Sequence, residues 1–286
     1  MRGKWATMGL ICGLAAGVAA AQAPPRTTVD MTTMNCSGEV TTANIPRDSY
    51  LISGEKSVTK IVFSDHDMVY INRGADKGVN VGDQYRVLRP IHDDMPVQWF
   101  RGQYAMARAM GQIWADLGTI RVLHVGPKVS TAEVDANCAY MQRGDIILPY
   151  ADRPAPAFKP DGLLVDPFAP ATGKTGMLVM TKQLGEVVGN NDVVYVNLGS
   201  SQGLQVGSYL RIFRRQGNEG QANYQDKGTE YKMYGFGSTP VAYTWEGLPR
   251  EILGEGIVIR VSGNSATVMI TATRREIYLG DYVEVE

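Results

Sequence analysis

Short apolar runs alternate with glycine-rich turns along most of the chain, and this pattern predicts β-strands. Val69–Asn72 and Tyr85–Leu88 are rich in β-branched, aromatic and aliphatic residues, which favour strands. The two later runs Gly118–Val125 and Ser130–Val134 predict a hairpin, because Gly126-Pro127-Lys128 between them is typical of a turn.

The same pattern occurs twice. Val69–Arg89 aligns without a gap with Val194–Arg214, and the later block Leu117–Asp145 matches Leu253–Asp281. Several short strands joined by tight turns are typical of a small barrel or sandwich, and closing a barrel removes exposed strand edges. The predicted fold class is therefore all-β, with two tandem small β-barrel-like domains joined by a proline-rich linker.

This repeat divides the chain into five predicted segments. They are a signal peptide over 1–21, a partly disordered N-terminal segment over 22–50, a first β-barrel-like repeat over 51–150, a Pro/Ala/Gly-rich linker over 151–180, and a second repeat over 181–286. The linker prediction rests on its prolines, which forbid a continuous helix or a central strand.

The first segment has the layout of a secretory signal. Arg2 and Lys4 precede an apolar run that is shorter than a membrane span requires. Cleavage after Ala21 is preferred to cleavage after Ala23, because Pro24 would follow the second cut directly. We expect a periplasmic or secreted protein with no transmembrane segment once the signal is removed. The formal charge of −1 indicates no basic face for a nucleic acid.

Two cysteines remain after the signal, Cys36 and Cys138. In an oxidising compartment they could form a disulfide that ties the N-terminal segment to the first repeat. The alternative is two separate buried thiols.

The residues shared by the two copies are mainly turn residues. Asp and Ser after a turn glycine bond local backbone amides, so a structural role is predicted for these positions. The set is Gly74, Gly78, Gly82, Asp83, Gly144, Asp145, Gly199, Gly203, Gly207, Gly280 and Asp281.

No convincing catalytic site is visible. Gly199–Gly203 matches the Gly-x-Ser-x-Gly nucleophile pattern around Ser201, but a turn and a strand follow where that motif requires a helix. No histidine stands in metal-ligand spacing with another histidine or with a cysteine. We predict a protein that is not an enzyme and has no metal site and no cofactor.

Two excursions interrupt the repeats, the first over 90–116 and the second over 215–252. Aromatic side chains on loops are favoured at interfaces, so these are candidate partner-binding residues. The alternative is that they cover an otherwise small core. A short helix is predicted over Tyr104–Ala115. The candidates are Trp99, Phe100, Tyr104, Trp114, Tyr231, Tyr234, Phe236, Tyr243 and Trp245.

The pattern Val-x-x-Asn-x-Gly-x-x-x-Gly-[Val/Leu]-x-Val-Gly-[Asp/Ser], followed later by a Gly-Asp strand, resembles the C-terminal domain of flagellar assembly protein T. It is also similar to β-domains that follow LysM modules in secreted bacterial proteins. The resemblance covers both repeats and implies the fold, with no catalytic residues.

Three functions are weighed for this exported chain, and its oligomeric state stays open. The first is a non-enzymatic scaffold or assembly protein that binds envelope proteins. The second is a module that binds peptidoglycan or another polysaccharide of the cell wall. The third is a secreted hydrolase.

Overall fold

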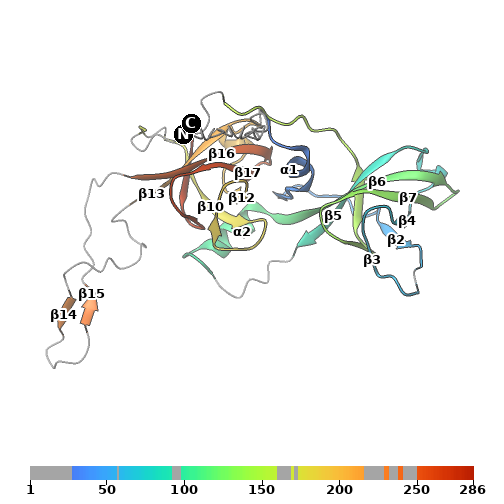
Figure 1. Cartoon of the computed structure of the whole chain (residues 1–286), viewed down its shortest axis with the longest axis horizontal. Coiled ribbons are helices and arrows are strands. Elements are labelled where there is room, and N and C mark those ends of the chain that lie inside the picture. Colours follow the sequence, from blue (N-terminus) through green and yellow to red (C-terminus); the bar gives the residue numbers. More distant parts are fainter. Residues whose placement is uncertain are drawn as a thin grey trace, which may run out of the picture.

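The computed structural model of the chain describes residues 28–56, 58–91, 98–159, 169–170, 173–215, 229–231, 238–240 and 250–286. These residues form mostly β-strands, and the predicted β-rich character is confirmed (Figure 1). None of the helices in this part of the chain has the length and hydrophobicity needed to cross a bilayer.

The first copy of the repeat forms a seven-stranded antiparallel sheet. Six of its strands follow the order β2-β4-β7-β6-β5-β9, and β1 pairs with the start of β6. The strands β3 and β8 form a separate two-stranded ribbon. The strands of this copy are β1 (Glu39–Thr41), β2 (Leu51–Gly54), β3 (Val62–Phe63), β4 (Met68–Ile71), β5 (Gln84–Ile91), β6 (Gln112–Val125), β7 (Ser130–Asn137), β8 (Met141–Gln142) and β9 (Ile146–Pro149).

The second copy forms a closed barrel. Its strands follow the order β10-β12-β17-β16-β13-β19, and β19 returns to pair with β10. Two small ribbons, β11–β18 and β14–β15, accompany the barrel. The strands are β10 (Thr175–Thr181), β11 (Val187–Val188), β12 (Val193–Val196), β13 (Tyr209–Arg214), β14 (Thr229–Tyr231), β15 (Ser238–Pro240), β16 (Glu251–Val261), β17 (Ala266–Thr273), β18 (Ile277–Tyr278) and β19 (Tyr282–Val285).

The two copies differ in how the first and last strands meet. In the second copy β10 pairs with β19 over three residues, Thr175–Met177. In the first copy the equivalent contact is an isolated bridge between Tyr50, just before β2, and Ile146 of β9, and Ile147 N donates to the Ser49 carbonyl at 2.9 Å. Continuous strand pairing therefore closes one barrel in the described residues, where the sequence predicted two.

The predicted boundary between linker and second repeat, at residue 180, lies inside β10. The apolar run Met177–Met180 belongs to β10, and its Leu178 is fully buried in the barrel core. The second repeat therefore begins by Thr175.

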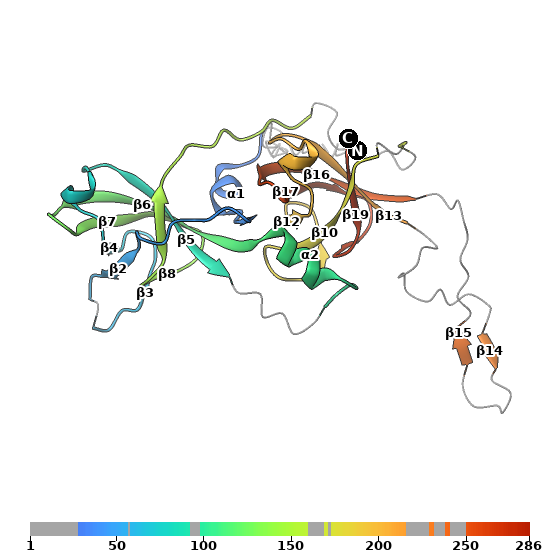
Figure 2. The same cartoon turned by 180° about the vertical axis from the view of Figure 1, so that it is seen from behind.

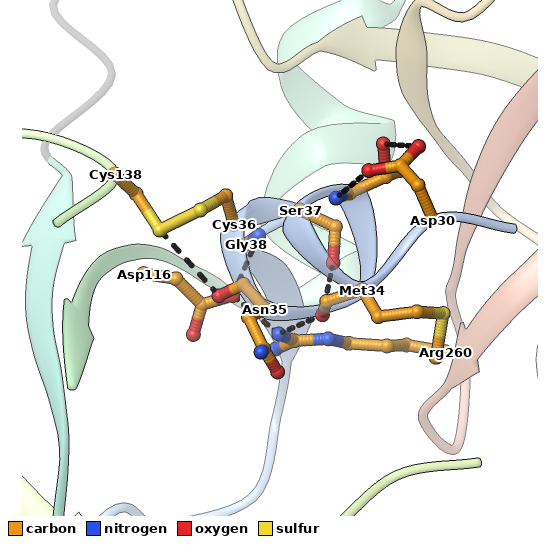
Figure 3. The surroundings of a disulfide bond; sticks show 10 residues. Asp30, Met34, Asn35, Cys36, Ser37, Gly38, Asp116, Cys138 and Arg260 are labelled. Carbon is orange, nitrogen blue, oxygen red and sulfur yellow. Dashed lines mark hydrogen bonds and ion pairs between the residues drawn. A yellow bond between two sulfur atoms is a disulfide. The ribbon is translucent and has the colours of Figure 1, made fainter. Parts of the chain in front are cut away.

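The N-terminal segment, for which partial disorder was predicted, is a structured part of the molecule from Thr28 onward. It forms helix α1 (Met31–Cys36), whose first turn is capped by the Asp30 carboxylate, which accepts a hydrogen bond from Thr33 N at 2.8 Å. Cys36 and Cys138 form a disulfide, with their Cα atoms 5.4 Å apart (Figure 3). A polar, threonine-rich segment gains its order here from partners far away in the sequence.

The described part of the linker runs along the second copy. Ala157 pairs with Thr28 in an isolated bridge, and Phe158 packs against a buried cluster that includes Met34. The Lys159 ammonium lies 2.8 Å from both Glu255 and Glu286. Burial raises the pKa of Glu255, and the neighbouring Glu286 adds to that rise while Lys159 opposes it.

This raised pKa predicts a specific dependence of stability on pH. The folded state holds the Glu255 proton more tightly than the unfolded chain does. The resulting stabilisation is fully present below the ordinary pKa of 4.5 and is lost as the pH rises through the raised pKa. We therefore expect Glu255→Gln to gain stability relative to the native chain as the pH rises from about 4 to about 8. Urea unfolding across this range measures the difference. A difference that stays constant with pH would contradict it.

Removal of the disulfide should destabilise the chain strongly. The bond closes a loop between residues 102 positions apart, so the Cys36→Ser/Cys138→Ser variant is expected to lose about 4 kcal/mol of unfolding free energy. Denaturant unfolding in oxidising buffer gives this value. The native chain with reductant should match the double variant, and an unchanged midpoint in both would refute the prediction.

Candidate functional site

One outer face of the second barrel is covered by the first excursion. Helix α2 (Gln103–Met110) lies in this excursion, and Met106 and Met110 pack in one cluster with Val179 and Met180 of β10. The Gln103 side-chain amide, itself fully buried, donates a hydrogen bond of 2.9 Å to the Val179 carbonyl.

Helix α2 starts near the predicted position but ends at Met110, before the predicted end at Ala115. Gly111 follows with a φ of 111°, and a Cβ on it would lie 2.2 Å from the Thr41 carbonyl oxygen. Only glycine fits this approach between β1 and the end of the helix. The chain then continues as β6.

The N-terminal segment covers the adjoining part of the same face. The Tyr195 hydroxyl donates to the Ser37 carbonyl at 2.9 Å, and the Thr267 hydroxyl donates to the Gly38 carbonyl at 3.3 Å. Burial raises the pKa of Tyr195 well above its ordinary value, so the phenol keeps its proton and remains a donor.

A buried ion pair lies at the centre of this contact. Asp116 of β6 pairs with Arg260 of β16, and both side chains are almost fully buried (Figure 3). Arg260 also donates to the Met34 carbonyl at 3.1 Å, while Asp116 accepts from the Gly38 amide at 2.9 Å. The pair therefore joins both copies of the repeat to the N-terminal segment between them.

The same face exists in the first copy, although the sequence alignment began only at Val69. Strand β2 pairs with β4 as β10 pairs with β12, with a register shift at the same place, between Leu51 and Ser53 in one and between Leu178 and Met180 in the other. Three positions of the first copy thereby correspond to Met177, Val179 and Tyr195. They are Tyr50, Ile52 and Tyr70, and we call them the copy 1 outer face.

A shared asparagine supports this equivalence. The Asn72 side-chain oxygen accepts from Tyr50 N at 2.8 Å, and the Asn197 oxygen accepts from Met177 N at 2.7 Å. This contact explains the asparagine in the repeat motif, which fixes the start of the strand that carries the outer face.

The two equivalent faces differ in how they are covered. In the second copy Val179 is fully buried and Tyr195 is 3% exposed. In the first copy Tyr50 is 40% exposed and Ile52 is 38% exposed. The copy 1 outer face is thus an exposed apolar surface whose counterpart in the second copy is covered by other segments of the same chain.

Sequence reasoning missed Tyr50 and Ile52 as functional candidates. The usable signal was the pair of neighbours Leu51 and Ile52, since adjacent residues of a strand point to opposite faces and both are apolar. Leu51 is in the core, and the side chain of Ile52 is exposed on the outer face.

The first excursion uses its aromatic residues inside the molecule. Trp114, predicted as a partner contact, is 2% exposed and packs with Ile45, Leu88 and Ile146, which corrects that prediction. Phe100 is half-buried and packs against the second barrel, where its ring lies beside Gly280.

The remaining aromatic candidates are not brought together by the described residues. Trp99 is 39% exposed, and Tyr104 is partly buried on α2. Tyr231 lies in β14, and its side chain is outside the described part of the chain. The candidates that lie wholly outside the described residues are Tyr234, Phe236, Tyr243 and Trp245.

The repeated turn carboxylates all accept local backbone amides. The donors are Asn80 N to Asp83 at 2.9 Å, Gln142 N to Asp145 at 2.6 Å and Tyr278 N to Asp281 at 2.8 Å. Asp145 and Asp281 each also bind an arginine of the paired strand, Arg89 and Arg214 respectively, at 2.7 Å. These contacts hold the turns before the closing strands.

The turn glycines fall into two groups. Gly78, Gly82, Gly144, Gly203, Gly207 and Gly280 adopt left-handed φ values. Gly74 and Gly199 instead face a neighbouring hairpin tip, where a Cβ would lie within 2.5 Å of a carbonyl oxygen.

Ser201 lies in a short 3₁₀ turn, Ser200–Gln202, and β13 follows that turn without an intervening helix. The equivalent turn of the first copy, Ala75–Lys77, has the same form. Across the described residues, no three His, Cys, Asp or Glu side chains gather in a way that could hold a metal ion.

Comparison of the chain with models of known protein families finds no match, and comparison with curated proteins finds none either.

Loss of one partner of the buried ion pair should be costly. Asp116→Ala removes the close carboxylate partner of the buried Arg260 and leaves it only the longer contact with Glu39 at 3.9 Å, so we expect a loss of about 3–5 kcal/mol in unfolding free energy. Arg121→Ala removes the exposed pair with Asp135 and should cost at most about 1 kcal/mol. Equal losses in denaturant unfolding of the two variants would contradict the assigned role of Asp116.

Proposed function

We propose that this protein is an exported, non-enzymatic scaffold of the cell envelope that acts through protein–protein contacts at the copy 1 outer face. One observation carries the proposal. The equivalent face of the second copy is covered by other segments of the same chain, and in the described residues the first copy leaves that face exposed.

The disulfide supports export. Structural disulfides persist in oxidising compartments such as the bacterial periplasm. The bond between Cys36 and Cys138 joins the N-terminal segment to the first copy and is partly shielded by the surrounding structure. It fits the signal sequence expected at the start of the chain and the envelope setting that the resemblance to flagellar assembly protein T implies.

The buried core also supports a scaffold. The disulfide, the Asp116–Arg260 pair and the α2 contact fix the two copies in one arrangement. A fixed arrangement lowers the entropy that a scaffold loses when a partner binds.

The proposal of a wall-binding module gains no comparable support. Exposed, coplanar tryptophans would favour it, and Trp114 is buried. Trp99 is half-exposed and has no second described tryptophan beside it to form a flat platform.

A photo-crosslinking side chain at position 52 tests the proposed function in the cells that produce the protein. We expect a crosslinked protein partner from position 52, because Ile52 lies at the centre of the exposed face. The matched control is position 81, since Val81 is apolar and 67% exposed and its counterpart in the second copy, Val206, is also exposed, at 51%. Position 52 yielding no partner, or the same products as position 81, would contradict the proposal.

A further inference from the structure

The two excursions occupy the same place in the two copies of the repeat. The first connects β5 to β6, and the second connects β13 to β16, which is the equivalent pair of strands. The first excursion docks on the outer face of the next repeat along the chain, through α2 and Phe100. The two excursions are equivalent, so the second excursion would dock on the outer face of a first copy placed after it.

In the described residues of the second excursion, strands β14 and β15 pair with each other and with no other described strand. Its sequence is rich in large apolar and aromatic residues, which resembles the composition of the first excursion. These residues are Tyr224, Tyr231, Met233, Tyr234, Phe236, Tyr243, Trp245 and Leu248.

The donor and the acceptor lie toward opposite ends of the molecule. Figures 1 and 2 place β2 and β3 at one end of the long axis and β14 and β15 at the other, beyond the barrel. A donor at one end and an acceptor at the other suit contact between molecules, in a head-to-tail arrangement.

We propose that the copy 1 outer face binds the second excursion of another molecule of this chain. The contact between molecules would repeat the one that already joins the first excursion to the second copy within each molecule. Tyr50, Ile52 and Tyr70 would take the places that Met177, Val179 and Tyr195 have in that internal contact. This inference rests on the proposed function and names the partner of the same site.

Two purified variants separate the donor from the acceptor. Ile52→Lys places a charge on the copy 1 outer face and keeps the second excursion. The other variant replaces residues 216–249 with a short Gly-Ser turn, which the hairpin allows because Arg214 and Glu251 are paired neighbours. Val81→Lys is the matched control for a new lysine on an exposed apolar position of the same copy, because its counterpart Val206 is exposed as well.

Sedimentation velocity over a concentration series measures the association. We expect the native chain and Val81→Lys to form oligomers as the concentration rises, because each molecule carries both surfaces. Each of the two variants alone should remain monomeric. An equimolar mixture of them should form a 1:1 dimer and nothing larger, since it offers one functional face and one functional excursion.

Other results would overturn the inference. A native chain that stays monomeric at about 100 µM would exclude a contact of useful strength. Dimers of the variant that lacks residues 216–249 would show that two copy 1 outer faces contact each other. Crosslinking from position 52 to a different envelope protein would refute the self-contact and leave the proposed function standing. Circular dichroism and thermal unfolding confirm that each variant is folded.

Discussion

The apolar outer surface of the second copy has to be covered, and the rest of the structure follows from this constraint. Ile257, Ile259 and Met269 are buried beneath Val29 and Met34 of the N-terminal segment. Burial of each such side chain stabilises by roughly 1.5–3 kcal/mol. The equivalent positions of the first copy are Arg121, Leu123 and Glu133, which are open to solvent or only half-buried. The covering segments therefore gather on one copy and leave the other exposed.

Much of the fold could be predicted from the sequence, because turn residues act locally. The aspartate of each shared Gly-Asp pair accepts a hydrogen bond from a local backbone amide, and these pairs mark the strands in both copies. The closed barrel of the second copy was predicted, but the difference between the two copies was not. That difference lies in the pairing of the first and last strands, which covers Thr175–Met177 in the second copy and one isolated bridge at Tyr50 in the first.

The site was harder to predict than the fold for a physical reason. Aromatic residues of the first excursion are attractive candidates for binding, and Trp114 and Phe100 do bind, but to this chain itself. The N-terminal segment has no apolar periodicity of its own, and it is ordered by Asp116, Arg260 and Cys138 from distant parts of the sequence. Only the comparison of the two copies in space shows that Tyr50 and Ile52 lie on the equivalent of a covered face.

In this account, segments of the same chain cover the outer face of the second copy, and another molecule covers the copy 1 outer face. Hydroxyl-radical footprinting of the full chain over a concentration series tests both halves at once. The account predicts that Tyr195 and Met180 are protected at every concentration, while Tyr50 is labelled in dilute solution and becomes protected as concentration rises. Labelling of Tyr50 that does not change with concentration, or labelling of Tyr195 in the folded chain, would contradict it.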